Sequence, residues 1–402
     1  MPIIHDVGLP LILSFLATLA AAAMSYGTDP RWMEQGSWGL GVIVLSRRLQ
    51  WPLVAVSLVL CVSLLGLVIS GKRRVWWLIA LAPVMALFVH RFVTAPSNRY
   101  AILDEPTFVS AADAKQIRDE DYVVGVVFDD QPYAYPYAAL YGAPVIVQSD
   151  RERRMLLIWS GPANAATAMT VSRDIKARDL DIVCDPADTL LVYNGRTGEF
   201  IVGLTGQTTR GQPPAGVEKP LSSTKLTWKQ WRAAHPDTRV LNAPSRGPTT
   251  PLSPHLPSIN AKLGVTLIAQ GNAVIAVRGD DIGAAPLNLK VGDVPVVVFR
   301  DRFTGQICAF DRRLEADLIP QFKLPRDAKQ REKGVAVVDS DTSTGWSGRG
   351  VAVDGNKEWR GKKLTAVDVR EDIYLGAAQF WYHDLTLFAD PHLVQSTAHS
   401  NP

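Results

Sequence analysis

Residues that build metal and redox sites are scarce in this sequence. Its 402 residues include three cysteines, none at the Cys-x-x-Cys spacing of zinc ribbons or thioredoxin-like centres. Cys61 lies in an apolar run, and two buried thiols are favoured over a disulfide for Cys184 and Cys308. The seven histidines contain no His-Glu-x-x-His or His-x-x-x-His pair. We therefore predict no metal site and no cofactor.

A strong charge of either sign is also missing. The chain has 42 Lys and Arg residues against 39 Asp and Glu residues. Seven of the basic and three of the acidic residues lie in the first 93 positions, which leaves 35 basic and 36 acidic residues in the rest. A region balanced in this way offers no basic surface to a phosphate backbone, so we predict no nucleic-acid partner.

Three long apolar runs lie near the N-terminus. They cover residues 7–26, 51–70 and 75–93, and the first two carry no charge. A helix needs about 20 apolar residues to cross a bilayer, and tryptophans flank these runs as they do at membrane interfaces. We predict a membrane domain over residues 1–93 with three transmembrane helices, and hence the lipid bilayer as a partner. Residues 37–46 are too short to span, and should lie at the interface or extend the second helix.

The orientation of this domain is less determined. The first run ends in small residues, as a cleaved signal peptide does, but no Lys or Arg precedes it, which favours a retained helix. Three basic residues at positions 72–74 lie on one side of the membrane and four arginines on the other, so the positive-inside rule does not decide. The tight basic hairpin favours a cytoplasmic N-terminus, with the C-terminal region outside.

The remainder of the chain is predicted to be mainly β, with few short helices. A capping-box-like Ser110 and Asp113 predict one helix start, and Thr227 predicts the N-cap of a helix over residues 228–234. Apolar stretches bounded by turn residues predict strands at residues 122–129, 144–148, 155–159, 190–193, 265–269, 273–277 and 294–299.

A tandem duplication is predicted for this soluble region. The proline-rich residues 242–258 form a linker between two repeats of similar length, residues 94–241 and 259–402. Features recur in one order in both repeats. The pairs are Gly125-Val-Val-Phe with Gly264-Val-Thr-Leu, Pro144-Val with Pro295-Val, Thr197-Gly198 with Thr344-Gly345, and Thr227-Trp228 with Phe380-Trp381.

Several segments carry a family resemblance. They are PTFVSAADA from Pro106, DYVVGVVF from Asp121 with AYPY at 134–137, TW…W…HPDTRVL from Thr227, and TGWSGRGVAVDG from Thr344. Together they resemble a bacterial family, the domain of unknown function 3179, over nearly all of residues 94–402. The resemblance implies an extracytoplasmic domain and no known activity. The family's His-Glu and cysteine-bearing stretches are missing, and Ser149-Asp150 stands near the cysteine position.

No catalytic motif is complete. Asp339 and Asp341 lie in a DSDTSTG segment that departs from both EF-hand and phosphatase loops, so a side-chain-stabilised turn is expected there. With His383, these two residues are the candidates for a dispersed catalytic site. Residues 203–211 are glycine-rich but lack the lysine of a P-loop, which predicts a turn between strands.

Five aromatic residues are the candidates for ligand binding. Tyr133, Tyr135 and Tyr137 alternate along a strand, so they share one face of it. With Trp228 and Trp231 they either line a stacking groove for a sugar or peptide, or pack into the core. The leading hypothesis is a membrane-anchored, extracytoplasmic binding or scaffold domain without catalysis. The alternative is an extracytoplasmic hydrolase, and no ligand or protein partner is identified.

Overall fold

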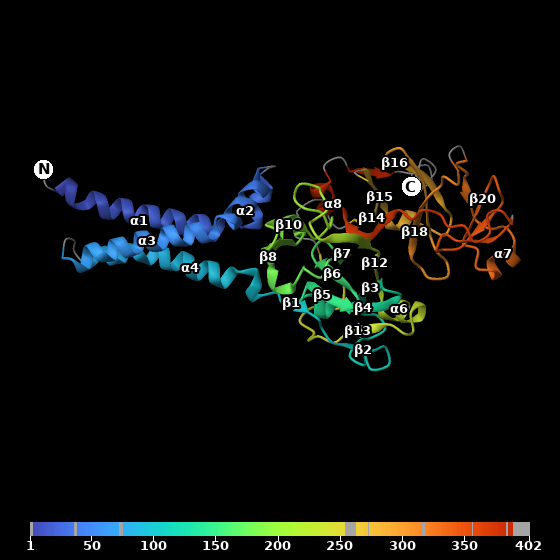
Figure 1. The fold of residues 1–402 in the computed structure, drawn as a ribbon, viewed down its shortest axis with the longest axis horizontal. Coiled ribbons are helices and arrows are strands. Elements are labelled where there is room, and N and C mark those ends of the chain that lie inside the picture. Colours follow the sequence, from blue (N-terminus) through green and yellow to red (C-terminus); the bar gives the residue numbers. More distant parts are fainter. Residues whose placement is uncertain are drawn as a thin grey trace, which may run out of the picture.

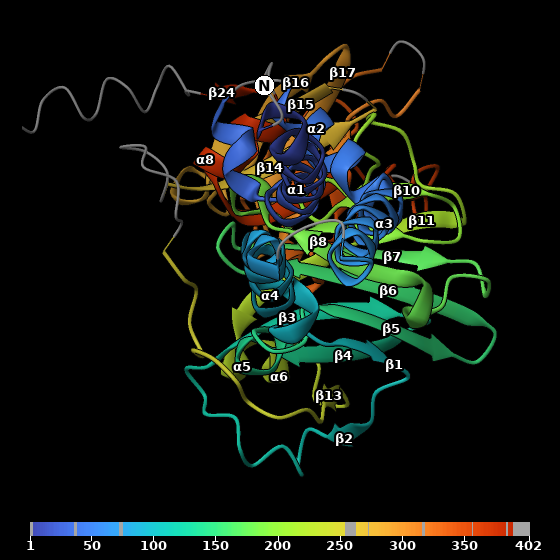
Figure 2. The same cartoon turned by 90° about the vertical axis from the view of Figure 1, so that its left-hand side faces the viewer.

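The chain folds into a helical bundle followed by a β-rich region. The computed structural model describes residues 3–35, 38–71, 75–253, 263–271, 273–315, 318–355, 357–382 and 385–388. The N-terminus lies at the end of the bundle away from the β-rich region (Figure 1). Seen along the bundle, the helices lie in front of the sheets (Figure 2).

Three helices are long and apolar enough to cross a membrane, as predicted. They are α1 (Ile3–Tyr26), α3 (Gln50–Ile69) and a third formed by the 3-10 segment η2 (Val75–Leu81) with α4 (Ala82–Thr94). Pro83 lies in the first turn of α4, where its missing N–H is tolerated. The sequence pattern therefore located all three spans, and it missed only the break before Pro83.

Small residues hold the bundle together. Ala17 and Ala21 of α1 are buried against Val84 of α4, and the Ser57 hydroxyl of α3 donates to the Ala17 carbonyl at 3.1 Å. Large apolar side chains such as Phe15, Val59 and Phe92 point outward and are exposed. This inverted arrangement, with small residues inside, is typical of helices packed within lipid.

Residues between the first two spans connect the bundle to the β-rich region. η1 (Pro30–Gln35) and α2 (Gly39–Arg48) form a bend, and α2 is a helix separate from α3. Ile43 is fully buried in one core with Phe200. Arg47 forms an ion pair with Asp181 at 2.7 Å. The segment expected to lie at the interface or extend α3 is therefore a docking helix for the soluble region.

The first half of the β-rich region contains three sheets and two short helices, α5 (Tyr137–Leu140) and α6 (Trp228–Ala234). Sheet 1 has the order β1 (Ile102–Asp104), β5 (Val145–Asp150), β6 (Arg153–Ser160), β7 (Ala165–Val171) and β11 (Val217–Leu221). Sheet 2 has the order β12 (Ser223–Thr227), β3 (Tyr122–Phe128), β4 (Gln131–Pro136), β13 (Arg239–Leu241) and β2 (Phe108–Ser110). Sheet 3 has the order β10 (Glu199–Val202), β9 (Leu191–Asn194) and β8 (Leu180–Cys184).

The second half also contains three sheets and two short helices, α7 (Ala328–Glu332) and α8 (Leu375–Trp381). Sheet 4 has the order β23 (Asp368–Tyr374), β14 (Gly264–Gln270), β15 (Ala273–Arg278) and β24 (Thr386–Phe388). Sheet 5 has the order β16 (Leu287–Val291), β17 (Val294–Arg300) and β18 (Ile307–Asp311). Sheet 6 has the order β19 (Phe322–Lys323), β20 (Val337–Asp339), β21 (Gly345–Trp346) and β22 (Ala352–Asp354).

Sheets 2 and 4 share a strand order. In both, the hairpin β3–β4 or β14–β15 is flanked by an antiparallel strand on one side and a parallel strand on the other. In both, a helix of seven residues follows the antiparallel strand directly. The agreement supports a tandem duplication, which stays a prediction.

The structural correspondence differs from the sequence pairs named above. Trp228 begins α6 and Leu375 begins α8, so Trp231 corresponds to Ala378 and not to Trp381. In the same way the fourth residues of β3 and β14 are Gly125 and Leu267. The first half therefore has a large residue in the helix and a small one in the strand, and the second half has the reverse.

One of the two predicted helix starts is wrong. Ser110 ends β2, and its hydroxyl bonds the Asp113 carboxylate at 2.6 Å, but the chain makes only a turn there. The other is confirmed, because Thr227 caps α6 in a capping box with Gln230. The described part of the proline-rich linker is bound to both halves, since the Tyr374 hydroxyl donates to the Leu252 carbonyl. The Arg246 amide donates to the Ala138 carbonyl at 2.7 Å.

The two halves share a buried polar contact. Asn164 donates from Nδ2 to the Asp372 carboxylate at 3.0 Å, and the buried Lys225 ammonium donates to the Asn164 carbonyl at 2.6 Å. Burial lowers the pKa of Lys225 to about 8, against the opposing effects of Asp372 and Glu371. We therefore expect the stability of the junction between the halves to depend on the protonation of Lys225.

Lys225→Met should make the free energy of unfolding less dependent on pH. The folded chain binds the Lys225 proton more weakly than the unfolded chain, because the pKa falls from 10.5 to about 8. As the pH rises from 8 to 10.5, the free energy of unfolding of the wild type should therefore increase by up to about 3 kcal/mol relative to that of Lys225→Met. Thermal unfolding in detergent across this range measures it, with the exposed Lys229→Met as control. Equal pH dependence in wild type and Lys225→Met would contradict the expectation.

Candidate functional site

The three alternating tyrosines are buried in one core. Tyr133 and Tyr135 lie on one face of β4, as the spacing predicts, whereas Tyr137 begins α5; all three pack in one core with residues of sheet 1. The Tyr135 hydroxyl donates to Gln148 at 2.7 Å, and burial raises the pKa of Tyr135 well above its ordinary value. Tyr135 and Tyr137 are therefore enclosed in the core, whereas Tyr133 also forms part of a cavity wall.

The two tryptophans are equally inaccessible to a ligand. Trp228 and Trp231 are each 1% exposed. Trp231 donates from Nε1 to the Thr238 hydroxyl at 2.9 Å, and its ring lies directly over Gly125. A Cβ atom at Gly125 would lie 2.3 Å from the ring, so the strand accepts only glycine beneath this indole. The core interpretation therefore holds for both residues.

Asp339 is a structural carboxylate. It is fully buried, and five donors reach its two oxygens. They include the Thr342 amide at 2.6 Å and the Trp346 indole at 3.0 Å. With every position around the carboxylate occupied, Asp339 serves the side-chain-stabilised turn that the sequence predicts.

Of the other two catalytic candidates, the structure describes only Asp341. Asp341 is exposed and accepts a hydrogen bond from the Ser340 hydroxyl at 2.9 Å. His383 lies outside the described residues. Asp339 and Asp341 do not line the two cavities that are described below. Within the described residues, Asp339 and Asp341 therefore have only the roles of a structured turn, and the dispersed catalytic group of the hydrolase alternative stays a prediction.

A cavity of about 430 Å³ lies between the two halves, and we call it the cleft. The first half contributes the end of β10 and the glycine-rich turn up to Gly211. The second half contributes the β14–β15 turn, β23 and the end of α8. The cleft therefore forms only when segments far apart in the sequence come together.

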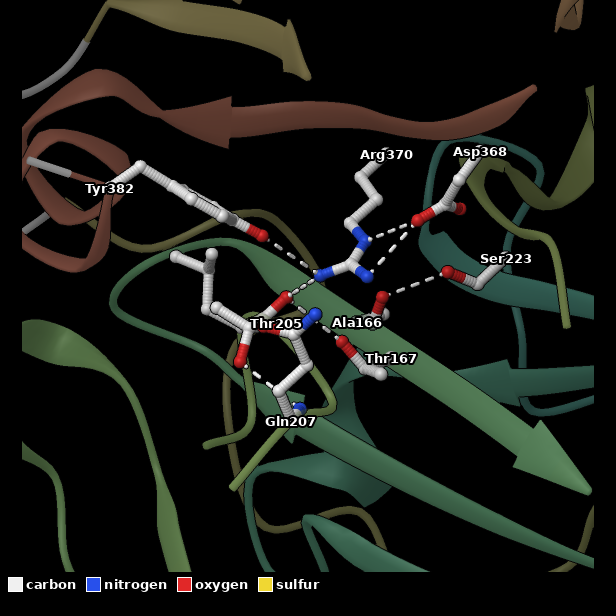
Figure 3. Close-up of polar contacts among 9 residues, drawn as sticks. Ala166, Thr167, Thr205, Gln207, Ser223, Asp368, Arg370 and Tyr382 are labelled. Carbon is white, nitrogen blue, oxygen red and sulfur yellow. Dashed lines mark hydrogen bonds and ion pairs between the residues drawn. The ribbon is translucent and has the colours of Figure 1, made fainter. Parts of the chain in front are cut away.

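Arg370 crosses the cleft from β23 (Figure 3). Its Nε and Nη2 donate to one Asp368 oxygen at 3.1 and 3.0 Å, and its Nη1 donates to the Leu204 carbonyl of the other half. The Tyr382 hydroxyl lies 3.5 Å from Nη1. Burial lowers the pKa of Arg370, but the negative charge of Asp368 raises it by more, so the pKa lies above its usual value. Arg370 is therefore a fixed, paired cation that joins the two halves.

The glycine-rich turn shapes the opposite wall. Gly206 has a φ of +66°, and a Cβ atom there would lie 2.7 Å from the Thr167 methyl group. The Thr167 hydroxyl donates to the Leu204 carbonyl at 3.1 Å, so this one carbonyl accepts hydrogen bonds from both Thr167 and Arg370. The turn predicted for this segment is therefore confirmed, and it presents Thr205, Gln207, Thr208 and Thr209 to the cleft.

Aromatic side chains complete the cleft. Trp381 and Tyr382 are partly buried and line it from the end of α8. The Trp381 Nε1 has no hydrogen-bond partner among the described residues, although it is buried. Asp368 is paired with Arg370, and no histidine or cysteine is among the described lining residues. The site is suited to hydrogen bonding and stacking more than to proton transfer.

The sequence analysis missed Asp368, Arg370 and Trp381 as a site. One signal was present, because Asp368, Arg370 and Asp372 alternate along a strand and so mark a polar face. That pattern indicates a charged face, but it does not reveal that residues near 205 lie across from it.

The comparisons with known proteins identify a family. Residues 101–383 match the family described as "Protein of unknown function (DUF3179)". No curated protein and no solved structure matches the chain. The match covers both halves of the β-rich region and more than half of the sequence, as the quoted motifs led us to expect. The chain therefore belongs to the DUF3179 family.

Proposed function

We propose that this chain is a membrane-anchored binding protein whose soluble region binds a small polar ligand in the cleft. The observation that carries the proposal is the cleft itself, formed by both halves and lined by hydroxyl, amide and aromatic groups around the Asp368–Arg370 pair. The three apolar helices and the docking helix α2 would hold this region close to a membrane surface.

The lining favours a saccharide unit as the ligand. Threonine hydroxyls and the Gln207 amide offer both donors and acceptors to sugar hydroxyl groups. Trp381 offers an aromatic face, and its unpartnered Nε1 offers a further donor. A paired Arg370 and Asp368 add fixed donors and acceptors without net charge, which suits a neutral ligand. A pocket of this size, mostly polar with an aromatic wall, holds one or two sugar rings.

We place the soluble region outside the cytoplasm. The arginines on its side of the bundle have structural roles that explain their presence. Arg31 pairs with Asp29 at 2.6 Å, Arg47 pairs with Asp181, and Arg48 donates to the Gly198 carbonyl at 3.2 Å. The basic residues at positions 72–74 are then the ones that the positive-inside rule would keep in the cytoplasm.

Binding of saccharides by the full chain tests this function. The purified protein in detergent is titrated calorimetrically with a panel of mono- and oligosaccharides. We expect binding of at least one sugar, weakened at least about tenfold by Trp381→Ala, because loss of an aromatic contact at a binding site typically has this effect. Phe303→Ala, an exposed aromatic outside the cleft, is the matched control. No binding by the wild type, or binding unchanged by Trp381→Ala, would count against the proposal.

A reporter fused after Pro402 tests the orientation. We expect alkaline phosphatase, which is active only outside the cytoplasm, to be active there. A fluorescent protein that matures only in the cytoplasm should stay dark at the same position. The reverse pair of results would place the soluble region inside the cell.

A further inference from the structure

A second cavity of about 580 Å³ lies within the first half, away from the cleft. It opens between sheets 1 and 2, where β5 ends and β2 begins. Its residues share none with the cleft, so the two cavities are independent. We call it the β2–β5 cavity.

An unsatisfied amide lines this cavity. Gln148 is only 2% exposed, and its Oε1 already accepts from the Tyr135 hydroxyl. Its Nε2 has no partner in the described part of the chain. A buried donor without an acceptor typically costs about 1–3 kcal/mol, so an oxygen supplied by a ligand would relieve that cost.

An unpaired cation lies at the rim of the same cavity. Arg239 is exposed on β13, directly beside Tyr133 on β4 in the sheet register, so the two side chains share a face. Arg239 forms no ion pair among the described residues. Glu105, an acid that also lines the cavity, is already engaged by the Ser149 amide at 2.9 Å and hydroxyl at 2.7 Å, and by Arg154 at 3.3 Å.

The wall between the amide and the cation is apolar and rigid. The rings of Phe108 and Tyr133 meet edge to face, with centroids 5.0 Å apart. The Tyr133 hydroxyl is turned to the Asp150 carboxylate at 2.9 Å; burial and this contact raise its pKa to about 12. Tyr133 therefore stays neutral and presents its ring to the cavity.

We propose that the β2–β5 cavity binds a small organic carboxylate. The ligand's oxygens would accept from the Gln148 amide and the Arg239 guanidinium, and its carbon chain would lie against Phe108 and Tyr133. Carboxylates take such paired donors well, and the volume accommodates a chain of a few carbons. Asp237 also lines the rim and would meet an ammonium group, so the carboxylate could belong to a simple acid or to an amino acid.

Titration of the full chain with three probes tests the site: glutarate, L-glutamate and inorganic phosphate. We expect one or both carboxylates to bind, and Arg239→Ala to weaken binding at least about tenfold, as loss of a charge-assisted hydrogen bond does. Gln148→Leu should abolish binding. The exposed Arg178→Ala, outside the cavity, should leave it unchanged.

The three probes distinguish the possible ligands. Preference for L-glutamate assigns the site to an amino acid, and equal affinity for glutarate assigns it to a simple acid. No carboxylate binding, phosphate bound as well as the carboxylates, or binding that survives Arg239→Ala would overturn the assignment. Because Arg239 is exposed, this variant should fold even if Gln148→Leu does not. Trp381→Ala should have no effect, which keeps this test independent of the cleft.

Discussion

Trp231→Ala should be among the most damaging single substitutions in the soluble region. We expect a loss of about 3–5 kcal/mol, because removal of a fully buried indole leaves a large cavity. The substitution also removes the hydrogen bond to Thr238. Thermal unfolding of the full chain in detergent should show a fall in Tm of roughly 10 °C.

A double-mutant cycle with Gly125 gives the sharper form of this test. Gly125→Ala alone should destabilise, because its new Cβ atom meets the Trp231 ring. In the Trp231→Ala background the same change should be neutral or stabilising, since the ring is gone and alanine suits a strand better than glycine. Additive effects of the two changes would show that the ring does not lie over Gly125.

Trp381→Ala should behave differently from Trp231→Ala. The order of motifs along the sequence predicts equivalent roles and equal losses for the two tryptophans. In the structure Ala378 holds the position of Trp231, and Trp381 is a partly buried wall of the cleft. We therefore expect Trp381→Ala to cost only about 1 kcal/mol and to act mainly on ligand binding.

Asp339→Ala should also destabilise strongly, by about 3 kcal/mol or more. It leaves several donors without an acceptor, including the buried Thr344 amide and the Trp346 indole. Asp339→Asn should be milder, because the amide oxygen still accepts from some of these donors. Tm values from thermal unfolding of the full chain measure both.

Asp341→Ala is the matched control for this pair. Asp341 lies two residues away and is exposed, so its loss should change stability by less than about 0.5 kcal/mol. Equal losses at both positions would contradict the structural role assigned to Asp339. If Asp341→Ala left Tm unchanged but removed an enzymatic activity, the hydrolase alternative would regain support.

The three long apolar helices and seven of the 24 described strands were predictable because each depends on a local pattern. Charge-free runs placed α1 and α3 to within a few residues, and the apolar stretch at 122–129 became β3 (Tyr122–Phe128). Thr227 predicted α6 because a helix N-cap depends only on residues that are close together in the sequence. The helix predicted at Ser110 does not form, because the Ser110 and Asp113 side chains stabilise a single turn equally well.

The candidate site could not be predicted in the same way. Arg370 acquires its role from the Leu204 carbonyl, which lies in the other half of the chain. Burial of Tyr135 and Trp231 depends on sheets that cover them, so alternation alone could not separate a groove from a core. The docking of α2 through Ile43 and Arg47 likewise depends on Phe200 and Asp181, far along the sequence.

Hydrogen–deuterium exchange of the full chain, with and without the tightest-binding saccharide, tests the cleft most directly. The account predicts slower exchange on binding in two separate segments, the turn at residues 203–211 and the strand β23 around Arg370, because the ligand would contact both walls. Exchange around Asp339 should not change. Protection confined to one half, or protection elsewhere with both walls unaffected, would contradict a binding site formed between the two halves.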